Sequence, residues 1–470
     1  MKSGPASTGM AVIGAGSPRR RARAAGLAAA TLFLGAPARG AEPEGEEKAA
    51  FSLHSIGLKG SLAYKNFSHF QTTTNDDRTF RTEGILELEF GRRLTSWSTL
   101  RLVGEALLDD ANFARGLHYP VPDRKGRRSL LGIREGVLRL HGGEFEVTLG
   151  KQIYTWGTGD AFKPTDNINP YDYLDVLDNQ KMGVYSAAAR WSDGTTSVTA
   201  VVVPVFTPSR LPFAGDRWTS VPPSPLVAVV DQRVLPADQP ANAQFAARIR
   251  TTLSGWDLSV SYYEGFEHTP VIRQSSQVVS LFPFLIVPRL TPVFTRMRVP
   301  GVDFSTAVGK WEFHGEGAFK LADRNGWGDR FQGLLGLNYT LDELGVSWLE
   351  QIVVVAEYAR EIVLENRPAS GVLRPSGALG LGDLLSSNVF RNAFVGRLIF
   401  KFTEDTQLKL TGVLDISGSP NHYSQLKLTH KLTDALNIET GFDLLTGPRD
   451  TIWGRWRSND RFFFVARYLF

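Results

Sequence analysis

The chain has 470 residues, no cysteine and a formal charge of +4. Without cysteine it can form neither a disulfide framework nor a thiolate metal site. Its basic excess comes from the first 41 residues, so the charge gives no reason to expect a nucleic-acid partner.

The N-terminal segment has the order of a secretory signal peptide. Lys2 and the arginines between Arg19 and Arg23 precede an apolar run, AAGLAAATLFLGA, and the small-residue stretch ARGA. The run is too short to span a bilayer as a helix. We therefore expect Sec export, a signal peptide over residues 1–41 and a periplasmic N-terminal segment over 42–54. Cleavage there removes six basic residues and no acidic one, which leaves a formal charge of −2.

The remaining chain, residues 55–470, repeats about ten residues of apolar and polar alternation followed by a turn. In residues 390–402, Phe394, Leu398 and Phe400 share one parity, whereas Arg391 and Arg397 share the other. No stretch after the signal has eighteen uninterrupted apolar residues, so spanning helices are excluded. Charged residues in the middle of long strands fit the wet lumen of a membrane barrel better than the core of a soluble sandwich.

The last ten residues, RFFFVARYLF, place Phe464, Tyr468 and Phe470 on one face. They resemble the C-terminal strand signature of bacterial outer-membrane proteins, which the barrel-assembly machinery reads. The resemblance implies a partner in that machinery, outer-membrane lipid around the barrel and a Gram-negative outer-membrane location.

The pattern predicts an all-β fold: a transmembrane antiparallel β-barrel of about eighteen strands, although sixteen or twenty also fit. Short connections (LTSW, HGG, SDGT, LSGW) alternate with long ones, as expected when short turns lie in the periplasm. The expected strands are 55–68, 80–93, 98–108, 129–140, 144–155, 182–191, 196–206, 243–252, 257–266, 299–309, 311–323, 329–340, 348–363, 389–403, 406–416, 421–431, 436–446 and 460–470.

Parity assigns charged side chains to the lumen of this barrel. Basic residues cluster on one arc, the fourteenth to sixteenth strands, and acidic residues are concentrated elsewhere. Opposed charges across the pore would create a transverse field that orients solutes. The alternative is that any wet lumen must be charged. The candidate pore-lining residues are Arg391, Arg397, Lys401, Lys409, Lys427, Glu312 and Glu316.

The segment GKQIYTWGTGDAFKPTDNINPYDY, residues 150–173, leaves the fifth strand and opens the third external loop. In general porins the third loop folds into the lumen and narrows it, and we expect the same here. Parity points Gln152, Tyr154 and Trp156 inward and leaves Lys151 on the lipid side. Asp160, Asp166 and Asp172 are expected to supply pore electrostatics and turns. The spacing of a calcium loop is absent, so no metal site is predicted.

The same segment contains Gly150-Lys151-Gln152, Trp156-Gly157 and Asn169-Pro170-Tyr171-Asp172. It resembles a little-characterised family of proteobacterial outer-membrane porin-like barrels that carry a GKQ…WG…NPxD segment. The resemblance implies an outer-membrane porin or transport role and names no substrate.

The function we expect is passive, porin-like passage of small polar or anionic solutes, without cofactor or catalytic residues. Two alternatives stay open: a transporter of apolar or amphipathic compounds, and a barrel scaffold for an export or envelope complex. The transporter alternative depends on the apolar run VVSLFPFLIVPR, residues 278–289, which could form a plug, a lipid contact or a substrate site. A homotrimer is also left open. An enzyme comes last, because no nucleophile and base stand together.

Overall fold

The protein is described here from a computed structural model. It describes residues 57–117, 121, 123–213, 215–219, 229–230, 232–281, 284–323, 326, 328–365 and 390–470. The expected signal peptide and periplasmic segment lie outside these residues. Within the described ranges, no helix has the length and apolar character needed to cross a membrane.

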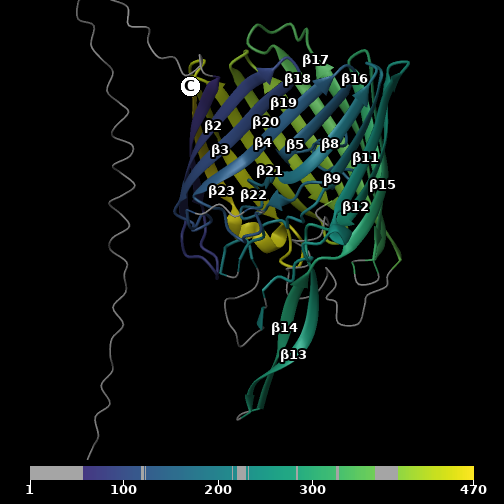
Figure 1. Cartoon of the computed structure of the whole chain (residues 1–470). Helices are drawn as coiled ribbons and strands as arrows, with labels where there is room; N and C mark the ends of the chain where they lie inside the picture. The colour runs from purple at the N-terminus through teal and green to yellow at the C-terminus, as the bar shows by residue number, and fades with distance from the viewer. Residues whose placement is uncertain are drawn as a thin grey trace, which may run out of the picture. The chain divides into compact units, whose positions relative to one another are not determined.

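Eighteen antiparallel strands form one closed barrel, which confirms the predicted fold class. Each strand pairs with the next wall strand along the chain, and β1 pairs with β23 from Ser61↔Leu469 to His69↔Arg461 to close the sheet. The strands are tilted, as closure of a barrel requires (Figure 1). They are β1 Leu58–His69, β2 Phe80–Thr95, β3 Ser98–Asp109, β4 Leu131–Gly142, β5 Phe145–Gln152, β8 Val184–Ser192, β9 Thr196–Val203, β11 Gln244–Leu253, β12 Trp256–Phe266, β15 Arg296–Val308, β16 Trp311–Ala322, β17 Asp329–Leu341, β18 Gln351–Glu365, β19 Asn392–Lys401, β20 Thr406–Asp415, β21 Asn421–Lys431, β22 Leu436–Thr446 and β23 Arg461–Leu469.

The other described elements lie in the long loops. Two short strands, β6 (Tyr171–Asp172) and β7 (Gln180–Lys181), pair within the third loop. A separate three-stranded sheet joins β10 (Val229–Val230), β13 (Val271–Leu281) and β14 (Phe284–Val293). The two 3-10 helices are η2, Pro240–Asn242, and η4, Gly454–Asn459.

The two faces of each wall strand differ in the way the sequence predicts. On β5, Val147 and Leu149 are 37 % and 40 % exposed on the outer surface, whereas Thr148 between them is 8 % exposed. On β1, Leu62 faces outward and Ala63 inward in the same alternation. Because side chains alternate across a strand, the barrel has an apolar outside and a polar inside.

Exposed aromatic side chains gather at the end of the barrel that carries the short turns. Trp97, Trp256, Trp311 and Trp348 lie in these turns or at the first residue of the strand that follows, and all are exposed. Tyr468 lies at the same end, opposite Leu436 at the start of β22, and so does Phe470, at the C-terminus marked in Figure 1. Such a ring of aromatic side chains marks the membrane–water interface of outer-membrane barrels.

Lys151 does not keep the lipid-facing position that parity predicts. It is 5 % exposed, and its Nζ donates to the carbonyl oxygen of Ile133 at 2.6 Å. The register shifts between Val103 and Gly104 where β3 meets β4, and Gly150 adopts φ 123°. The bulge is on β4, whereas Gly150 directly precedes Lys151 on β5. A glycine with positive φ redirects the side chain that follows it, and simple alternation cannot predict this.

The apolar run 278–289 does not plug the barrel mouth. It belongs to the β13–β14 hairpin, which pairs from Val271↔Val293 outward and extends beyond the long-loop end of the barrel (Figure 1). The base of the hairpin is packed, with Leu290 completely buried, whereas Val278 and Ile286 are 48 % and 50 % exposed. The interpretation of this segment as a lumenal plug was wrong.

Candidate functional site: the lumen and its third loop

The third loop, residues 153–183, leaves β5 and returns at β8, and its tip is bound by Glu316 on the inner face of β16. The Glu316 carboxylate accepts hydrogen bonds from the Gly159 N–H at 2.8 Å and from the Thr165 hydroxyl at 2.7 Å. The Thr165 N–H donates to the same carboxylate at 3.2 Å. A buried carboxylate thus satisfies three donors that would otherwise be lost from water.

A second carboxylate, Glu357 on β18, holds the adjoining turn of the tip. It accepts the N–H groups of Asp160 at 2.6 Å and Ala161 at 3.1 Å. His314 of β16 lies 3.0 Å from the same carboxylate through Nε2. Because these bonds use backbone N–H groups of the loop, they fix the path of the tip. They do not involve the loop side chains, which stay free to make other contacts.

The returning arm of the loop is attached through Asp172 to two other long connections, the one between β3 and β4 and the one between β9 and β11. Asp172 accepts from Arg128 Nε at 2.8 Å and from Arg210 Nη1 at 2.7 Å. Burial alone would raise the pKa of Asp172, but the two guanidinium groups outweigh it and lower this pKa to about 2. The loop therefore carries a fixed negative charge here at any physiological pH.

Two further aspartates bind the pair of strands at which the barrel closes. Asp175 accepts from Arg461 of β23 at 2.6 Å and also pairs with Arg81 of β2. Asp178 pairs with Lys65 of β1 at 2.7 Å. The third loop thus contacts inward-facing side chains of β16 and β18 with its tip and of β1, β2 and β23 with its returning arm, so it crosses the interior of the barrel.

Turn chemistry explains why the loop adopts this path. Asp172 accepts the Leu174 N–H and Asp175 accepts the Leu177 N–H, each two residues further along. The side chain of Asn169 donates to the carbonyls of Gln152 at 3.0 Å and Met182 at 2.8 Å, which joins the two ends of the loop. Such local side-chain bonds are the reason Asp and Asn favour turns.

The inward aromatic residues at the start of the loop have packing roles. Gln152 is buried and donates to Ser186, and the Tyr154 hydroxyl lies 2.9 Å from the Ser186 hydroxyl. Trp156 is 6 % exposed within an apolar cluster, with the Arg248 guanidinium 5.9 Å from its ring centre. They face inward as predicted, but Trp156 supports the loop instead of lining open space.

Asp166 is bound within the loop itself. It forms an ion pair with Lys181, and burial raises its pKa against the attraction of that lysine. Among the described residues, no group of three or more His, Asp or Glu is placed to hold a metal ion. The aspartates of this loop each pair with a cationic side chain; they are Asp160, Asp166, Asp172, Asp175 and Asp178.

The predicted basic residues lie on one arc of the wall, β19 to β21. Arg397, Lys409 and Lys427 occupy inward positions, and Lys401 lies at the last position of β19. Lys409 is directly opposite Lys427 in the β20–β21 register. Arg391 precedes β19 and is not part of it, in contrast to the predicted strand 389–403.

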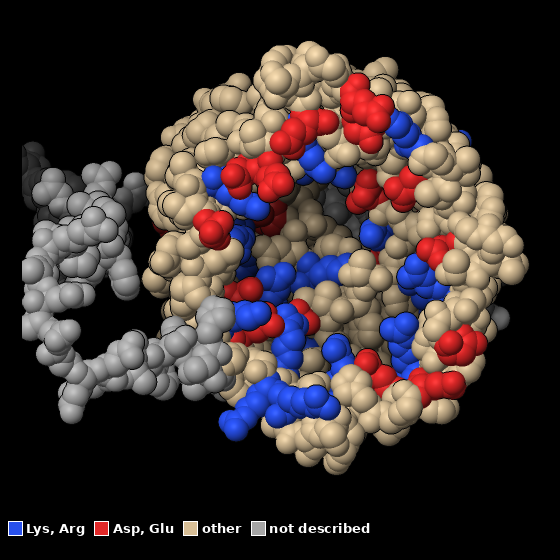
Figure 2. All heavy atoms as spheres, turned by 90° about the horizontal axis from the view of Figure 1, so that it is seen from above, with Lys and Arg blue, Asp and Glu red and all other residues tan. Residues whose placement is uncertain are grey.

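The predicted acidic side of a transverse field is largely neutralised. Glu316 is bound to the loop tip, and Glu312 lies near the short-turn end of β16, where it accepts from Asn338. On β2, Glu87 pairs with Arg134 at 2.9 Å and Glu89 with Arg101 at 2.8 Å. Figure 2, a view into the end that carries the short turns, shows basic and acidic side chains intermingled around the hollow.

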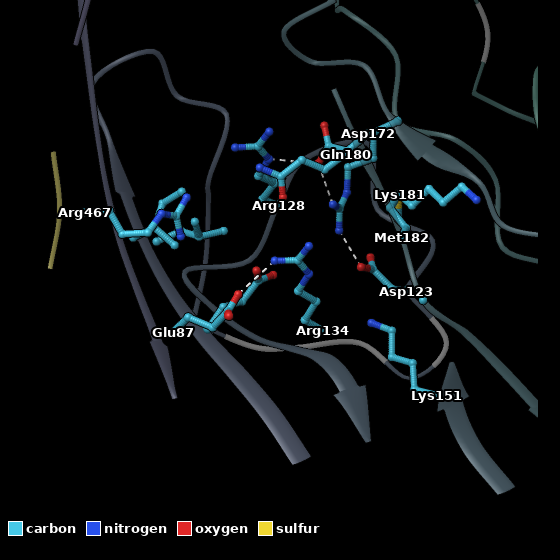
Figure 3. Close-up of a pocket in the computed structure, with 15 residues that line it drawn as sticks. Glu87, Asp123, Arg128, Arg134, Lys151, Asp172, Gln180, Lys181, Met182 and Arg467 are labelled. Carbon is cyan, nitrogen blue, oxygen red and sulfur yellow. Dashed lines mark hydrogen bonds and ion pairs between the residues drawn. The ribbon is translucent and has the colours of Figure 1, made fainter. Parts of the chain in front are cut away.

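A cavity of about 70 Å³ remains between the loop and β2 to β5. Figure 3 shows Arg134 directed at Glu87, Arg128 at Asp172, and Lys151 at the edge of the cavity. The cationic and anionic groups around it are mostly paired with one another. The cavity is therefore a by-product of the ion-pair network that attaches the loop.

Sequence reasoning missed the residues that bind the loop. Glu357, Arg81 and Arg461 were not among the predicted pore-lining residues. Their signal is a charged residue near the buried, long-loop half of a strand, and each is at most 7 % exposed. Their partners lie between 94 and 286 positions away in the chain, which strand periodicity cannot reveal.

The C-terminal aromatic residues follow the predicted alternation. Phe464 and Tyr468 lie on the outer face of β23, and Tyr468 is 48 % exposed. The backbone of Phe470 exchanges two hydrogen bonds with Gly60, at 2.8 and 3.0 Å. The terminal residue is therefore part of the closing strand pair.

The fold and site together define a closed eighteen-stranded membrane-type barrel with a loop bound across its lumen. No protein-family model matches the chain, and no curated protein matches it.

Among solved structures, the chain is similar to Pseudomonas aeruginosa OccK1 (OpdK), with 11% sequence identity, a TM-score of 0.46, and coverage of 88% of this chain and 98% of that one. It is similar to Salmonella typhi OmpF in complex with daunomycin, with 9% identity, a TM-score of 0.39, and coverage of 88% and 99%. A triple mutant of the Rhodopseudomonas blastica porin gives 11% identity, a TM-score of 0.36, and coverage of 88% and 99%.

Proposed function

We propose that this protein is an outer-membrane channel for passive passage of small polar or anionic solutes. The observation that carries the proposal is the opposition of the two barrel faces. The outside is apolar and bears aromatic residues at the short-turn end, whereas the inside carries charged side chains on most strands. A wall of this kind meets lipid on one side and water on the other.

The third loop supports a size-selective passage. Its tip and returning arm are bound to different sets of strands, so it narrows the lumen at a fixed position. Backbone N–H groups bound by buried carboxylates resist displacement, since each lost bond leaves a buried charge unsatisfied. Solutes pass beside the loop, along the basic wall of β19 to β21.

Planar bilayers containing the purified protein test the proposal. The expected result is steady ohmic conductance, and a bilayer that stays sealed contradicts channel activity. Deleting residues 157–181 is expected to raise the conductance by removing the loop. A conductance that stays the same in a correctly folded barrel would show that the loop does not narrow the passage.

The preference for anions rests on the basic arc. Replacing Arg391, Arg397 and Lys401 together by glutamine is expected to shift the reversal potential in a salt gradient towards cations. Arg391 lies outside β19, so most of the shift is expected from Arg397 and Lys401. An unchanged reversal potential removes the anion preference and leaves channel activity intact.

A transporter of apolar compounds is less well supported than it was from sequence. The apolar run 278–289, on which that alternative depends, lies in a hairpin outside the barrel sheet. Uptake of an apolar carbon source that is lost on deleting 278–289 would restore it. Membership of the GKQ…WG…NPxD family, the assembly-machinery partner, the homotrimer and the scaffold role stay predictions.

A further inference from the structure

Arg397 and Lys409 are diagonal neighbours on the lumen wall. In the β19–β20 register Arg397 is opposite Thr411 and Ile399 is opposite Lys409, so the two cationic side chains share the inner face two positions apart. Diagonal neighbours in an antiparallel pair have Cβ atoms about 7 Å apart, within reach of long side chains. One small carboxylate can therefore contact both cationic groups.

The positive charge of Arg397 and Lys409 is not fully neutralised by neighbouring acidic side chains. Lys427, directly opposite Lys409, is paired with Glu439 at 2.8 Å. Lys409 has no hydrogen bond or ion pair with any residue in the described part of the chain. Arg397 Nε is buried and makes no hydrogen bond to a described residue. Like charges directly across a strand pair are unfavourable, so an additional anion is favoured here.

The chain supplies one loosely held anion at this position. Asp160, in the tip of the third loop, lies 3.4 Å from Arg397 Nη1, and the Asp160 and Arg397 side chains are 39 % and 21 % exposed. No hydrogen bond joins them within the described structure. The ion pairs of Asp172 and Asp175, by contrast, are buried and hydrogen-bonded at 2.6–2.8 Å.

The side chain of Asp160 can move without the loop. Its backbone N–H is held by Glu357 at 2.6 Å, and the next N–H, of Ala161, is held by the same carboxylate. A rotation about the Asp160 side-chain bonds therefore releases Arg397 while the tip stays bound.

We propose that Arg397 and Lys409 form a binding site for the carboxylate of a passing solute, and that Asp160 occupies this site in the empty channel. A solute carboxylate replaces the Asp160 carboxylate at Arg397, and the loop backbone stays bound to Glu357. This proposal rests on the proposed channel function, and it adds that the solutes include carboxylates. Asp160 sets the threshold for binding, because it competes with every anion that enters.

Reversal potentials in gradients of potassium chloride and potassium acetate test this site. Asp160→Asn is expected to raise the permeability of acetate and chloride relative to potassium by about twofold to fivefold, the range set by a partly exposed ion pair. Lys409→Gln is expected to lower the acetate permeability while leaving the loop untouched. Asp160→Asn in an Arg397→Gln background is expected to have a smaller effect than in the wild type, because its partner is absent.

Asp342→Asn is the matched control. It removes the same charge in the β17–β18 turn, where Asp342 is paired with Lys310 at the rim. Its effect on selectivity is expected to be small at high salt, because a rim charge is screened over about one Debye length.

The outcomes separate the two proposals. A sealed wild-type bilayer overturns the channel function and the site with it. If the wild type conducts, the channel function stands, and either of two results overturns the carboxylate site alone. In one, Asp160→Asn and Lys409→Gln both match Asp342→Asn in selectivity. In the other, the effects of Asp160→Asn and Arg397→Gln simply add. If Asp160→Asn does not yield a folded barrel, an unchanged acetate permeability in Lys409→Gln overturns the site by itself.

Discussion

Asp175 in the third loop accepts a hydrogen bond from Arg461 of the last strand at 2.6 Å, although the two residues are 286 positions apart in the chain. Both side chains are at most 2 % exposed, and Asp175 also pairs with Arg81 of β2. Arginines on both sides of β1 thus share one loop carboxylate. The loop holds together the strand pair at which the barrel closes, and this arrangement has measurable consequences.

Replacing Asp175 by Asn is expected to destabilise the barrel by about 3–5 kcal/mol, the usual cost of leaving one partner of a buried ion pair alone. The urea midpoint of the folded barrel in detergent measures the change. Asp178→Asn is the control, because the Asp178 side chain is 28 % exposed and its ion pair with Lys65 is therefore partly solvated. Equal midpoints for the two variants would contradict a special role of Asp175.

Stability is expected to fall in acid because of Asp172. Its folded pKa of about 2 lies below the ordinary value of 3.8, so the ionised form favours the folded state. The contribution is complete above about pH 4 and is lost as the pH falls from there towards 2. It amounts to about 2 kcal/mol by linkage. Asp172→Asn should flatten the decline of the urea midpoint between pH 5 and pH 3, and a parallel decline would contradict the assignment.

Replacing Glu316 by Gln is expected to loosen the loop tip. The glutamine NH₂ group replaces one carboxylate oxygen and cannot accept, so the bonds from either Gly159 or Thr165 are lost. Larger fluctuations of single-channel current are expected, with little change in overall stability. Glu312→Gln is the matched control, because Glu312 is on the same face of β16 but is exposed and accepts from Asn338, outside the third loop. Current noise that is the same in both variants would show that Glu316 does not hold the tip.

Gly60 is expected to tolerate no side chain. A Cβ atom there would lie 2.3 Å from two ring atoms of Phe470, which packs over this glycine at the closing strand pair. Gly60→Val is therefore expected to reduce the fraction of heat-modifiable barrel in semi-denaturing gels. Gly91→Val, whose Cβ would meet no atom within 4 Å, is the control. A normal yield for Gly60→Val would show that the C-terminal ring can move aside.

The barrel could be predicted from sequence because the pattern that specifies each strand lies within a few neighbouring residues. Each strand needs only alternation and a turn, so the eighteen strands were found with ends displaced by a few residues, as for β15, predicted at 299–309 and observed at Arg296–Val308. The β13–β14 hairpin was missed because VVSLFPFLIV is apolar at every position except Ser280 and shows no alternation. Lys151 was misplaced because Gly150 before it adopts a positive φ, which breaks the alternation on β5.

The sequence predicted where the lumenal site lies, but not which of its residues are bound to one another. Inward-facing residues such as Glu316 and Arg397 could be identified, but the groups they bind could not. Glu316 contacts residues about 150 positions away, and Asp160 meets Arg397 only because the loop crosses the lumen. A free pore-lining carboxylate and a buried loop anchor have the same local sequence, and burial by a distant segment decides between them.

The third loop also stiffens the barrel wall against deformation. A hollow barrel resists stretching along its hydrogen bonds but flattens readily, because bending a sheet strains few of them. Bonds from one loop to Glu316 and Glu357 and to Arg461 and Lys65 oppose such flattening from within. Through these bonds the loop joins wall strands that lie far apart around the barrel.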